Sequence, residues 1–177
     1  MYIDLIIFRA INGLSGRWEL LDRSAIFFAV RAGNILLFLL IIFLIKDYKK
    51  YWKMVVEAVI AALFVRFVLV EAFYKFHFRL RPFAHDGIKL LIPYDINQTS
   101  FPSGHASFFF ALSTIIYAYN KKIGIAFYVV SFLIVISRIF VGVHWPSDVV
   151  AGIILGVIMG WVINKLFKKV NFSNANE

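Results

Sequence analysis

The chain has 177 residues, enough for one domain, and 62% of them are hydrophobic and 18% aromatic. A water-soluble domain of this size does not carry so much apolar surface, so the composition excludes the soluble classes and indicates an integral membrane protein. The absence of cysteine excludes disulfides and cysteine-bound zinc, and the net charge of +9 lies in short lysine clusters between apolar runs, which argues against a nucleic-acid binder.

The chain begins with a short apolar segment, residues 1–16, which Asp4, Arg9 and Asn12 interrupt. A bilayer span needs about 20 residues, so we predict instead an amphipathic helix that lies in the membrane interface. Residues 1–13 lack a basic leader followed by an apolar core and a small-residue cleavage site, so no cleavable signal peptide is expected.

Five apolar runs that follow are candidates to cross the membrane. The predicted spans are residues 24–45, 54–73, 103–119, 123–141 and 148–166. Lysines cluster between the first and second spans, between the third and fourth, and after the fifth. With this number of spans all three clusters share one face, which the positive-inside rule makes cytoplasmic. The connections 74–102 and 142–147 then meet on the outer face.

Four charged residues lie within or beside the predicted spans: Arg31, Glu57, Arg66 and Glu71. Charges inside a membrane are usually functional or paired. Arg66 and Glu71 belong to the outer half of the second span, where they could pair with each other or with Arg31. We interpret them as structural support.

The third span opens with Phe101, Pro102, Ser103, Gly104 and His105. A Pro-Ser-Gly turn at a helix start presents free backbone N–H groups, and the helix dipole favours an anion there. His105 follows in the first turn, beside whatever anion is held. The stretch predicts one wall of a phosphate-handling site.

A second wall is predicted between the fourth and fifth spans. Arg138 lies near the outer end of the fourth span, where an arginine costs several kcal/mol unless it is paired or wetted, and its planar fork suits a phosphate. Asp148 follows His144 by four residues, and a carboxylate that fixes an imidazole makes its other nitrogen a better nucleophile or base. The alternative is that Ser147 and Asp148 simply cap the fifth helix.

A third wall is predicted just beyond the second span, where Lys75, Arg79 and Arg81 carry positive charge. These side chains could instead snorkel to lipid phosphates without forming a site. Arg81 is less free than the others, because Pro82 restricts the backbone of the residue before it.

Together the three stretches resemble the signature motifs of the type 2 phosphatidic acid phosphatase family, which shares its site with vanadium haloperoxidases and bacterial acid phosphatases. The second motif is present at residues 102–105 and the third is complete over residues 137–148. The first departs from the pattern, because Tyr74 stands where the family has a lysine, seven positions before Arg81. Either a bulge brings Lys75 into that place or Arg79 takes over its phosphate contact.

The resemblance implies a role for each matching residue. His144 would be the nucleophile that forms a phosphohistidine, Asp148 would orient it, and His105 would act as general acid and then as base. The phosphate oxygens would be held by a ring of donors: Arg81, Arg138, Ser103, the Gly104 N–H, and Lys75 or Arg79. With so many donors and no acidic ligand cluster, neither a metal nor another cofactor is expected.

The resemblance also implies the fold and the activity. We expect one membrane-embedded domain over residues 1–177, an all-α bundle of five transmembrane helices plus the interfacial helix, with a haloperoxidase/acid-phosphatase-like core. The expected activity is hydrolysis of a lipid phosphate or diphosphate at the outer face of the inner (plasma) membrane, with the site facing the periplasm. Undecaprenyl diphosphate is the favoured substrate, because the compact length and the pattern of residues 12–22 resemble bacterial undecaprenyl diphosphate phosphatases.

Several alternatives stay open. Lipid A 1-phosphate, phosphatidylglycerol phosphate and phosphatidic acid are possible substrates. A non-catalytic lipid-binding or transport protein is the alternative of another class, although a pure binder has no use for both His105 and His144. The expected partners are the lipid substrate and membrane lipids, with no nucleic acid and no obligate protein partner.

Overall fold

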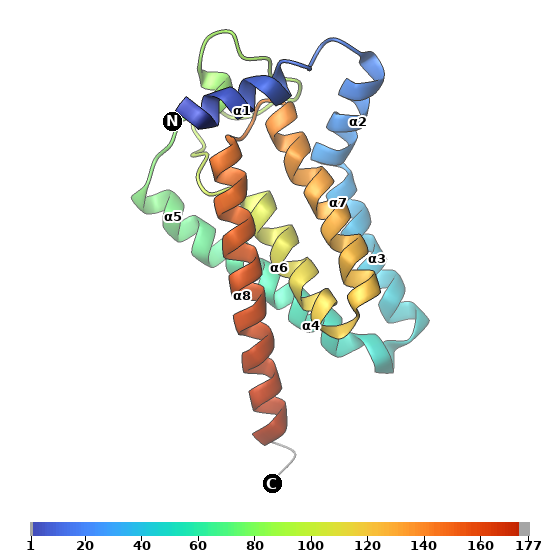
Figure 1. Ribbon diagram of the computed structural model, residues 1–177. Helices are drawn as coiled ribbons and strands as arrows, with labels where there is room; N and C mark the ends of the chain where they lie inside the picture. Colours follow the sequence, from blue (N-terminus) through green and yellow to red (C-terminus); the bar gives the residue numbers. More distant parts are fainter. Residues whose placement is uncertain (1, 174–177) are drawn as a thin grey trace.

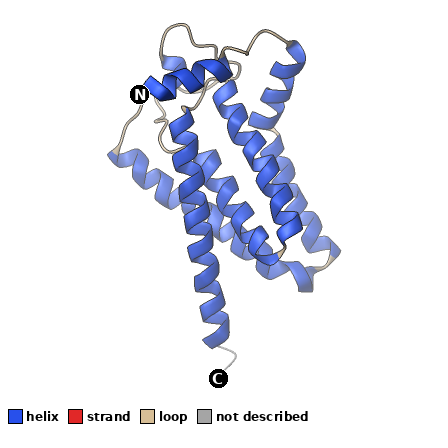
Figure 2. Cartoon of the chain, in the orientation of Figure 1, coloured by secondary structure: helices blue, strands red, loops and turns tan. Residues whose placement is uncertain are grey.

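The computed structural model describes residues 2–173, and over that range it contains helices, turns and loops but no strand (Figure 2). The predicted all-α class is confirmed. The helical elements are α1 (Tyr2–Asn12), α2 (Glu19–Val30), α3 (Ala32–Lys46), α4 (Tyr48–Phe64), η1 (Val65–Val70), α5 (Glu71–Phe76), η2 (Pro82–Ala84), α6 (Gly104–Tyr119), α7 (Lys121–Phe140) and α8 (Pro146–Ser173).

Side chains that cap the backbone fix where three of these helices begin. Asp47 accepts a hydrogen bond from a backbone N–H in the first turn of α4, Ser103 does so for α6, and Asn120 does so for α7. Such caps satisfy backbone donors that have no partner inside the helix. The third and fourth predicted spans therefore start within two residues of the predicted positions.

Two helices meet the length and hydropathy of a membrane span by themselves, α7 over Lys121–Phe140 and α8 over Pro146–Lys169. The first predicted span is a pair, α2 and α3, that meets the same test together but is bent by 50°. The bend falls at Arg31, whose charge interrupts the apolar run. With 17 and 16 residues, α4 and α6 are shorter, so the count of five spans stays a prediction.

The second predicted span lies within a helical segment that runs without interruption through α4, η1 and α5. Its middle section, Val65–Val70, is π-helical. A π-helical turn contains an additional residue, so it rotates the residues that follow, and such turns often occur at functional sites. Arg66 lies in this section.

The bundle is built around α6, which contacts α4, α7 and α8 (Figure 1). Glycines of α8 allow the closest of these approaches. A Cβ atom on Gly152 would lie 2.6 Å from the Ser103 carbonyl oxygen, and one on Gly156 would lie 2.5 Å from that of Ser107. Small residues at four-residue spacing let two helix backbones pack closely in a membrane. This packing fixes the first turns of α6 and α8 side by side.

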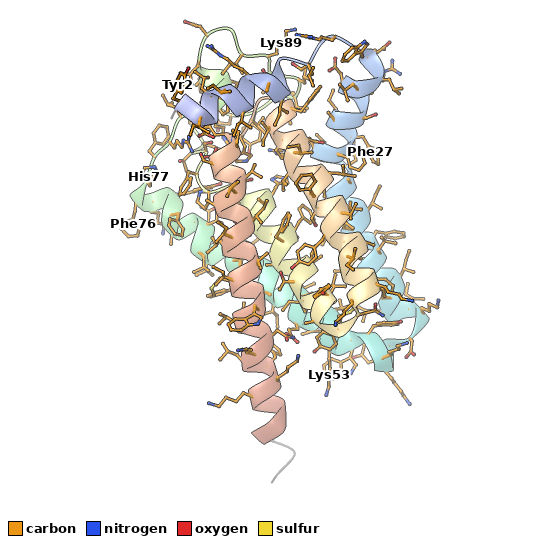
Figure 3. The ribbon with its side chains drawn as sticks, in the orientation of Figure 1. Tyr2, Phe27, Lys53, Phe76, His77 and Lys89 are labelled. Atoms are coloured by element: carbon orange, nitrogen blue, oxygen red, sulfur yellow. The ribbon has the colours of Figure 1, made fainter. Side chains whose placement is uncertain are left out.

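The two ends of the bundle differ in what they carry. Helix α1 lies across the end where α7 finishes and α8 begins, which we call the α1 end (Figure 1). Lys53 lies at the other end, far from Tyr2 and Lys89 (Figure 3). The long connection between α5 and α6 also lies at the α1 end, so the three predicted walls of the site are on the same side of the bundle.

Candidate active site

The three predicted stretches are joined to one another by hydrogen bonds at the α1 end. The backbone N–H of Ser103, before α6, donates to the carbonyl of Asp148 in α8 at 3.0 Å. The backbone N–H of Ser100 donates to the carbonyl of Arg79 at 2.9 Å. Segments far apart along the chain therefore form one continuous site.

Arg81 lies at the centre of this site, with 1% of its surface exposed. Its guanidinium donates to the backbone carbonyls of Gln98, Thr99 and Val143 at 3.0, 2.9 and 2.8 Å. Its Nη1 atom also lies 3.4 Å from the Nε2 atom of His144. The backbone restriction that Pro82 imposes is matched by an extended conformation at Arg81. The guanidinium thus has the fixed direction expected from the sequence.

His144 lies between two different surroundings. Its Nε2 atom faces Arg81, whereas its Nδ1 atom lies 3.6 Å from the Oδ2 atom of Asp148, just beyond a hydrogen bond. The imidazole is 1% exposed. Burial lowers the pKa of His144 well below its usual value, and the positive charges of Arg81 and Arg138 lower it further. The imidazole is therefore neutral at physiological pH, and a neutral imidazole is the form that can attack phosphorus.

Asp148 is fully buried and held by several donors. Its carboxylate accepts hydrogen bonds from the Trp145 N–H at 2.8 Å, from the Ser100 hydroxyl, and from Nη1 of Arg79 at 2.5 Å. The first of these bonds closes the first turn of α8, so the helix-capping role considered for Asp148 is present. Because Asp148 also faces His144, the two roles are combined in one carboxylate.

Arg138 is a buried cation that the described part of the protein leaves partly without hydrogen-bond partners. It is 3% exposed, and its Nη1 atom donates to the Ala29 carbonyl at 3.2 Å. Its Nε and Nη2 atoms are buried without a partner among the described residues. Leaving charged donors buried and unpaired is costly. Both Arg138 and Arg81 lie against the ring of Tyr94, with their Cζ atoms 5.3 and 4.2 Å from its centroid. Two buried arginines at one ring, of which Arg138 has unused donors, are suited to an anion.

The start of α6 completes the arrangement. Ser103 is buried and caps the helix, and Gly104 is buried next to it. His105 is partly exposed in the first turn of α6, directly after Gly104. It therefore lies next to the turn whose Ser103 N–H is hydrogen-bonded to the carbonyl of Asp148, the residue that faces His144.

The structure separates the two cations proposed for the incomplete first motif. Lys75 is exposed in the last turn of α5, outside this cluster, and no bulge turns it inward. Tyr74 points to the site instead, where its hydroxyl donates to the Pro102 carbonyl at 3.1 Å. Arg79 does reach the site, but its guanidinium pairs with Asp148 and with Asp4, each at 2.5 Å.

Asp4 is a residue that the motif comparison did not single out. From α1, its carboxylate accepts hydrogen bonds from the backbone N–H and hydroxyl of Ser147 at 2.9 and 2.6 Å, and it pairs with Arg79. Burial would raise the pKa of Asp4, but these bonds outweigh it and the pKa lies below its ordinary value. The sequence signal was an isolated acid within the apolar segment 1–16. Through Arg79, α1 is tied to Asp148.

Metal ligands do not gather in this way. Over residues 2–173, no group of three or more histidine, aspartate or glutamate side chains is placed to hold a metal ion. The donors that gather here are guanidinium groups, hydroxyls and backbone N–H groups. Such a set can hold a phosphoryl group, with a neutral imidazole beside it.

Comparisons with known proteins agree with this chemistry. A family model described as the PAP2 superfamily matches residues 35–172. The chain is 33% identical to the bacitracin transport permease protein BcrC of Bacillus licheniformis, over 96% of this chain and 83% of that protein. It is 30% identical to the undecaprenyl-diphosphatase BcrC of Bacillus subtilis, over 88% of this chain and 80% of that protein.

A solved structure shows the same likeness in three dimensions. The crystal structure of LpxE from Aquifex aeolicus superposes on this chain with a TM-score of 0.76 and 33% sequence identity. The superposition covers 92% of this chain and 95% of that one. The resemblance inferred from the three motifs is confirmed: the chain belongs to the PAP2 superfamily and is a membrane lipid phosphatase, a phosphoric ester hydrolase.

Proposed function

We propose that this phosphatase converts undecaprenyl diphosphate to undecaprenyl phosphate through a phosphohistidine on His144. The observation that carries the proposal is the pair of buried, unpartnered nitrogens of Arg138 beside a neutral imidazole. An anion that fills this position would satisfy donors that the protein leaves open. The phosphorus of a bound phosphoryl group would then lie within reach of Nε2 of His144.

In the first step, Nε2 of His144 attacks the terminal phosphorus, and the bond from phosphorus to the bridging oxygen breaks. His105 gives its proton to that oxygen, which leaves as undecaprenyl phosphate. Asp148 faces the Nδ1 side of the ring and stabilises the positive charge that develops on it. In the second step, His105 takes a proton from water, the hydroxide attacks phosphorus, and the bond to His144 breaks to release inorganic phosphate.

The ring of donors acts on the charge that spreads over the three equatorial oxygens during transfer. Arg81, Arg138, the Ser103 hydroxyl and the Gly104 N–H are the proposed contacts. Because Arg81 is already held by three backbone carbonyls, its orientation is set before substrate binds. Fixed donors in a site that excludes water stabilise such a transition state without reorganising.

The substrate preference is supported by the relatives. One of them is named an undecaprenyl-diphosphatase and is similar over most of its length. We place the site at the outer face of the inner membrane. The α3–α4 and α6–α7 connections, which carry two of the lysine clusters, lie at the opposite end of the bundle from α1 (Figure 1), and cytoplasmic loops carry the excess of lysine. Lipid A 1-phosphate, phosphatidylglycerol phosphate and phosphatidic acid are the competing substrates.

A transport role is the second candidate, and it is favoured by the name of one relative, a bacitracin transport permease protein. A transporter on this scaffold would bind the lipid phosphate and leave it intact. The neutral, buried His144 distinguishes the two, because binding alone does not need a nucleophile.

The test is phosphate release by the purified chain in detergent from each of the four lipids. We expect undecaprenyl diphosphate to give the highest kcat/KM. His144→Ala should reduce release at least about 10³-fold, because it removes the attacking nitrogen, and EDTA should leave release unchanged. Release that survives this substitution would overturn the phosphohistidine mechanism, and binding without release by the unmodified chain would favour transport.

A further inference from the structure

The wall of the site nearest α5 lacks the cation that the first motif normally supplies. Position 74 holds a tyrosine whose hydroxyl donates to the Pro102 carbonyl, and Lys75 is exposed in the last turn of α5. Arg79 is engaged by the carboxylates of Asp4 and Asp148. A phosphate bound at the start of α6 would therefore meet no basic side chain from residues 74–79 that is free to bind it.

Arg66 reaches this wall from η1. Its side chain lies directly on Gly104: a Cβ atom there would be 2.6 Å from Nε and 2.8 Å from Cδ of Arg66. Its Cζ atom is 5.8 Å from the centroid of the Tyr74 ring. The guanidinium thus lies between Tyr74 and the Pro-Ser-Gly turn, beside the place where a lysine at position 74 would act.

The π-helical turn holds Arg66 in this position. Glu71 follows five residues later, the spacing that a π-helical turn brings onto one face, and its Oε1 atom is 2.5 Å from Nη1 of Arg66. Among the described residues, Glu71 is the hydrogen-bond partner that the structure gives to the Arg66 guanidinium. The sequence left open whether Arg66 and Glu71 pair with each other or with Arg31. The structure pairs them with each other, which leaves the Nε side of the guanidinium toward Gly104.

Arg66 also lines a cavity beside the site. The cavity has a volume of about 420 Å³, and Glu71, Tyr74, Gln98 and Thr99 line it as well. Gln98 and Thr99 are the residues whose carbonyls hold Arg81. The side chain of Arg66 is 28% exposed. Arg66 is therefore accessible from the cavity and lies against Gly104, in the turn that opens α6.

We propose that Arg66 binds an oxygen of the substrate phosphate in place of the lysine that position 74 lacks. The assignment rests on the proposed function of the site. Gly104 contributes by having no side chain, since a methyl group there would displace the guanidinium. The cavity beside Arg66 then admits the phosphate end of the lipid from the outer surface.

The direct test measures binding of inorganic phosphate by calorimetry, together with kcat/KM on undecaprenyl diphosphate. Arg66→Ala should weaken phosphate binding about 10- to 100-fold, as expected for loss of a charge-assisted hydrogen bond, and should lower kcat/KM about 10²-fold. Arg66→Lys should retain part of both. Arg23→Ala is the matched control, because Arg23 is another arginine in an ion pair but is exposed in α2, and it should change neither.

A rescue variant makes the assignment specific. In the Arg66→Ala background, Tyr74→Lys restores the family's own cation, and we expect it to recover about tenfold in phosphate affinity. Lys75→Ala tests the competing residue: if it weakens phosphate binding while Arg66→Ala leaves binding unchanged, Lys75 and not Arg66 holds the phosphate. Failure of Tyr74→Lys to recover any affinity also counts against the assignment.

Glu71→Gln separates a phosphate contact from a structural ion pair. It removes the carboxylate that competes for the guanidinium, so phosphate should bind as tightly as in the unmodified chain or more tightly. A purely structural pair predicts equal losses from Glu71→Gln and Arg66→Ala, and that result would overturn the proposal. Because inorganic phosphate is the probe, the proposal is tested even if the unmodified chain hydrolyses none of the four lipids, which would refute the proposed function alone.

Discussion

Among the described residues, two buried polar clusters differ in whether the protein supplies hydrogen-bond partners for all of their charged groups. At the lysine end, Glu57 of α4 accepts hydrogen bonds from the Tyr119 hydroxyl and the Asn164 amide, each at 2.7 Å, so both carboxylate oxygens have partners. At the α1 end, Arg138 is equally buried but keeps two nitrogens unpartnered among the described residues. In a low-dielectric interior a closed network holds helices together, whereas an open one indicates a ligand site.

The largest effect is expected from replacing Asp148, whose carboxylate accepts several hydrogen bonds in the cluster at the α1 end. Asp148→Asn replaces an acceptor of three hydrogen bonds with an amide whose nitrogen cannot accept them. His144 would lose its oriented, negatively charged neighbour, and we expect kcat to fall about 10³- to 10⁴-fold. Phosphate release measured on a folded, monodisperse variant checks this, and a loss below about tenfold would show that Asp148 only caps α8.

The second prediction compares the cluster around Arg138, which is open because donors lack partners among the described residues, with the cluster around Glu57, which is closed because its oxygens have partners. Arg138→Gln should lower kcat/KM about 10²-fold by removing phosphate donors, with little loss of thermal stability, because the native guanidinium is poorly satisfied. Glu57→Gln should do the reverse: it should destabilise the fold by about 1–3 kcal/mol, since an amide cannot accept both bonds, and leave kcat/KM within about twofold. Thermal unfolding and phosphate release on both variants decide the matter. Activity lost equally in both would remove the distinction between the clusters.

The third prediction concerns α1, whose Asp4 joins the open cluster through Arg79 and Ser147. Asp4→Asn should loosen Arg79 and Ser147, and so shift the carboxylate of Asp148. We expect a loss of about tenfold in kcat with little change in KM, since Asp4 positions other residues and does not contact the substrate. Glu19→Gln, an exposed ion-pair partner in α2, is the control and should have no effect. A loss confined to KM would place Asp4 at the substrate instead.

The predictable parts of the site are those whose residues lie close together in the sequence. The four-residue interval from His144 to Asp148 and the Arg81–Pro82 pair can be read from the chain, and the structure places these residues together. Asp4 was not found because its contacts with Ser147 and Arg79 join positions 143 and 75 residues apart. No local sequence pattern specifies which of several cations such a carboxylate will pair with.

Arg66 shows a different limit of prediction from the sequence. Its place over Gly104 depends on a π-helical turn at Val65–Val70, whereas apolar periodicity predicts an ordinary helix there. The same limit applies to the fold. Hydropathy predicted the all-α membrane bundle and one span over residues 24–45, whereas the structure bends this segment by 50° between α2 and α3. Neither the π-helical turn nor the bend follows from apolar periodicity or hydropathy.

The smallest predicted effect is a shift in pH dependence, and it tests the electrostatics of the open cluster. Burial, then the charges of Arg81 and Arg138, lower the pKa of His144, so the acid limb of kcat/KM should lie below about pH 6.5, the ordinary value for histidine. Arg138→Gln removes one positive neighbour, which should raise this pKa and move the acid limb upward by less than about one pH unit. Glu57→Gln should leave it in place.

The same shift has a stability counterpart with a definite sign. Because the folded-state pKa of His144 lies below the unfolded one, the unfolded chain binds more protons between the two values. The stability due to the neutral His144 is therefore present above about pH 6.5 and is lost as the pH falls toward the folded-state pKa. Between pH 7.5 and pH 5, the melting temperature should fall less in His144→Gln than in the unmodified chain. An acid limb above pH 6.5, or equal acid sensitivity in both proteins, would mean that His144 is not held neutral by its surroundings.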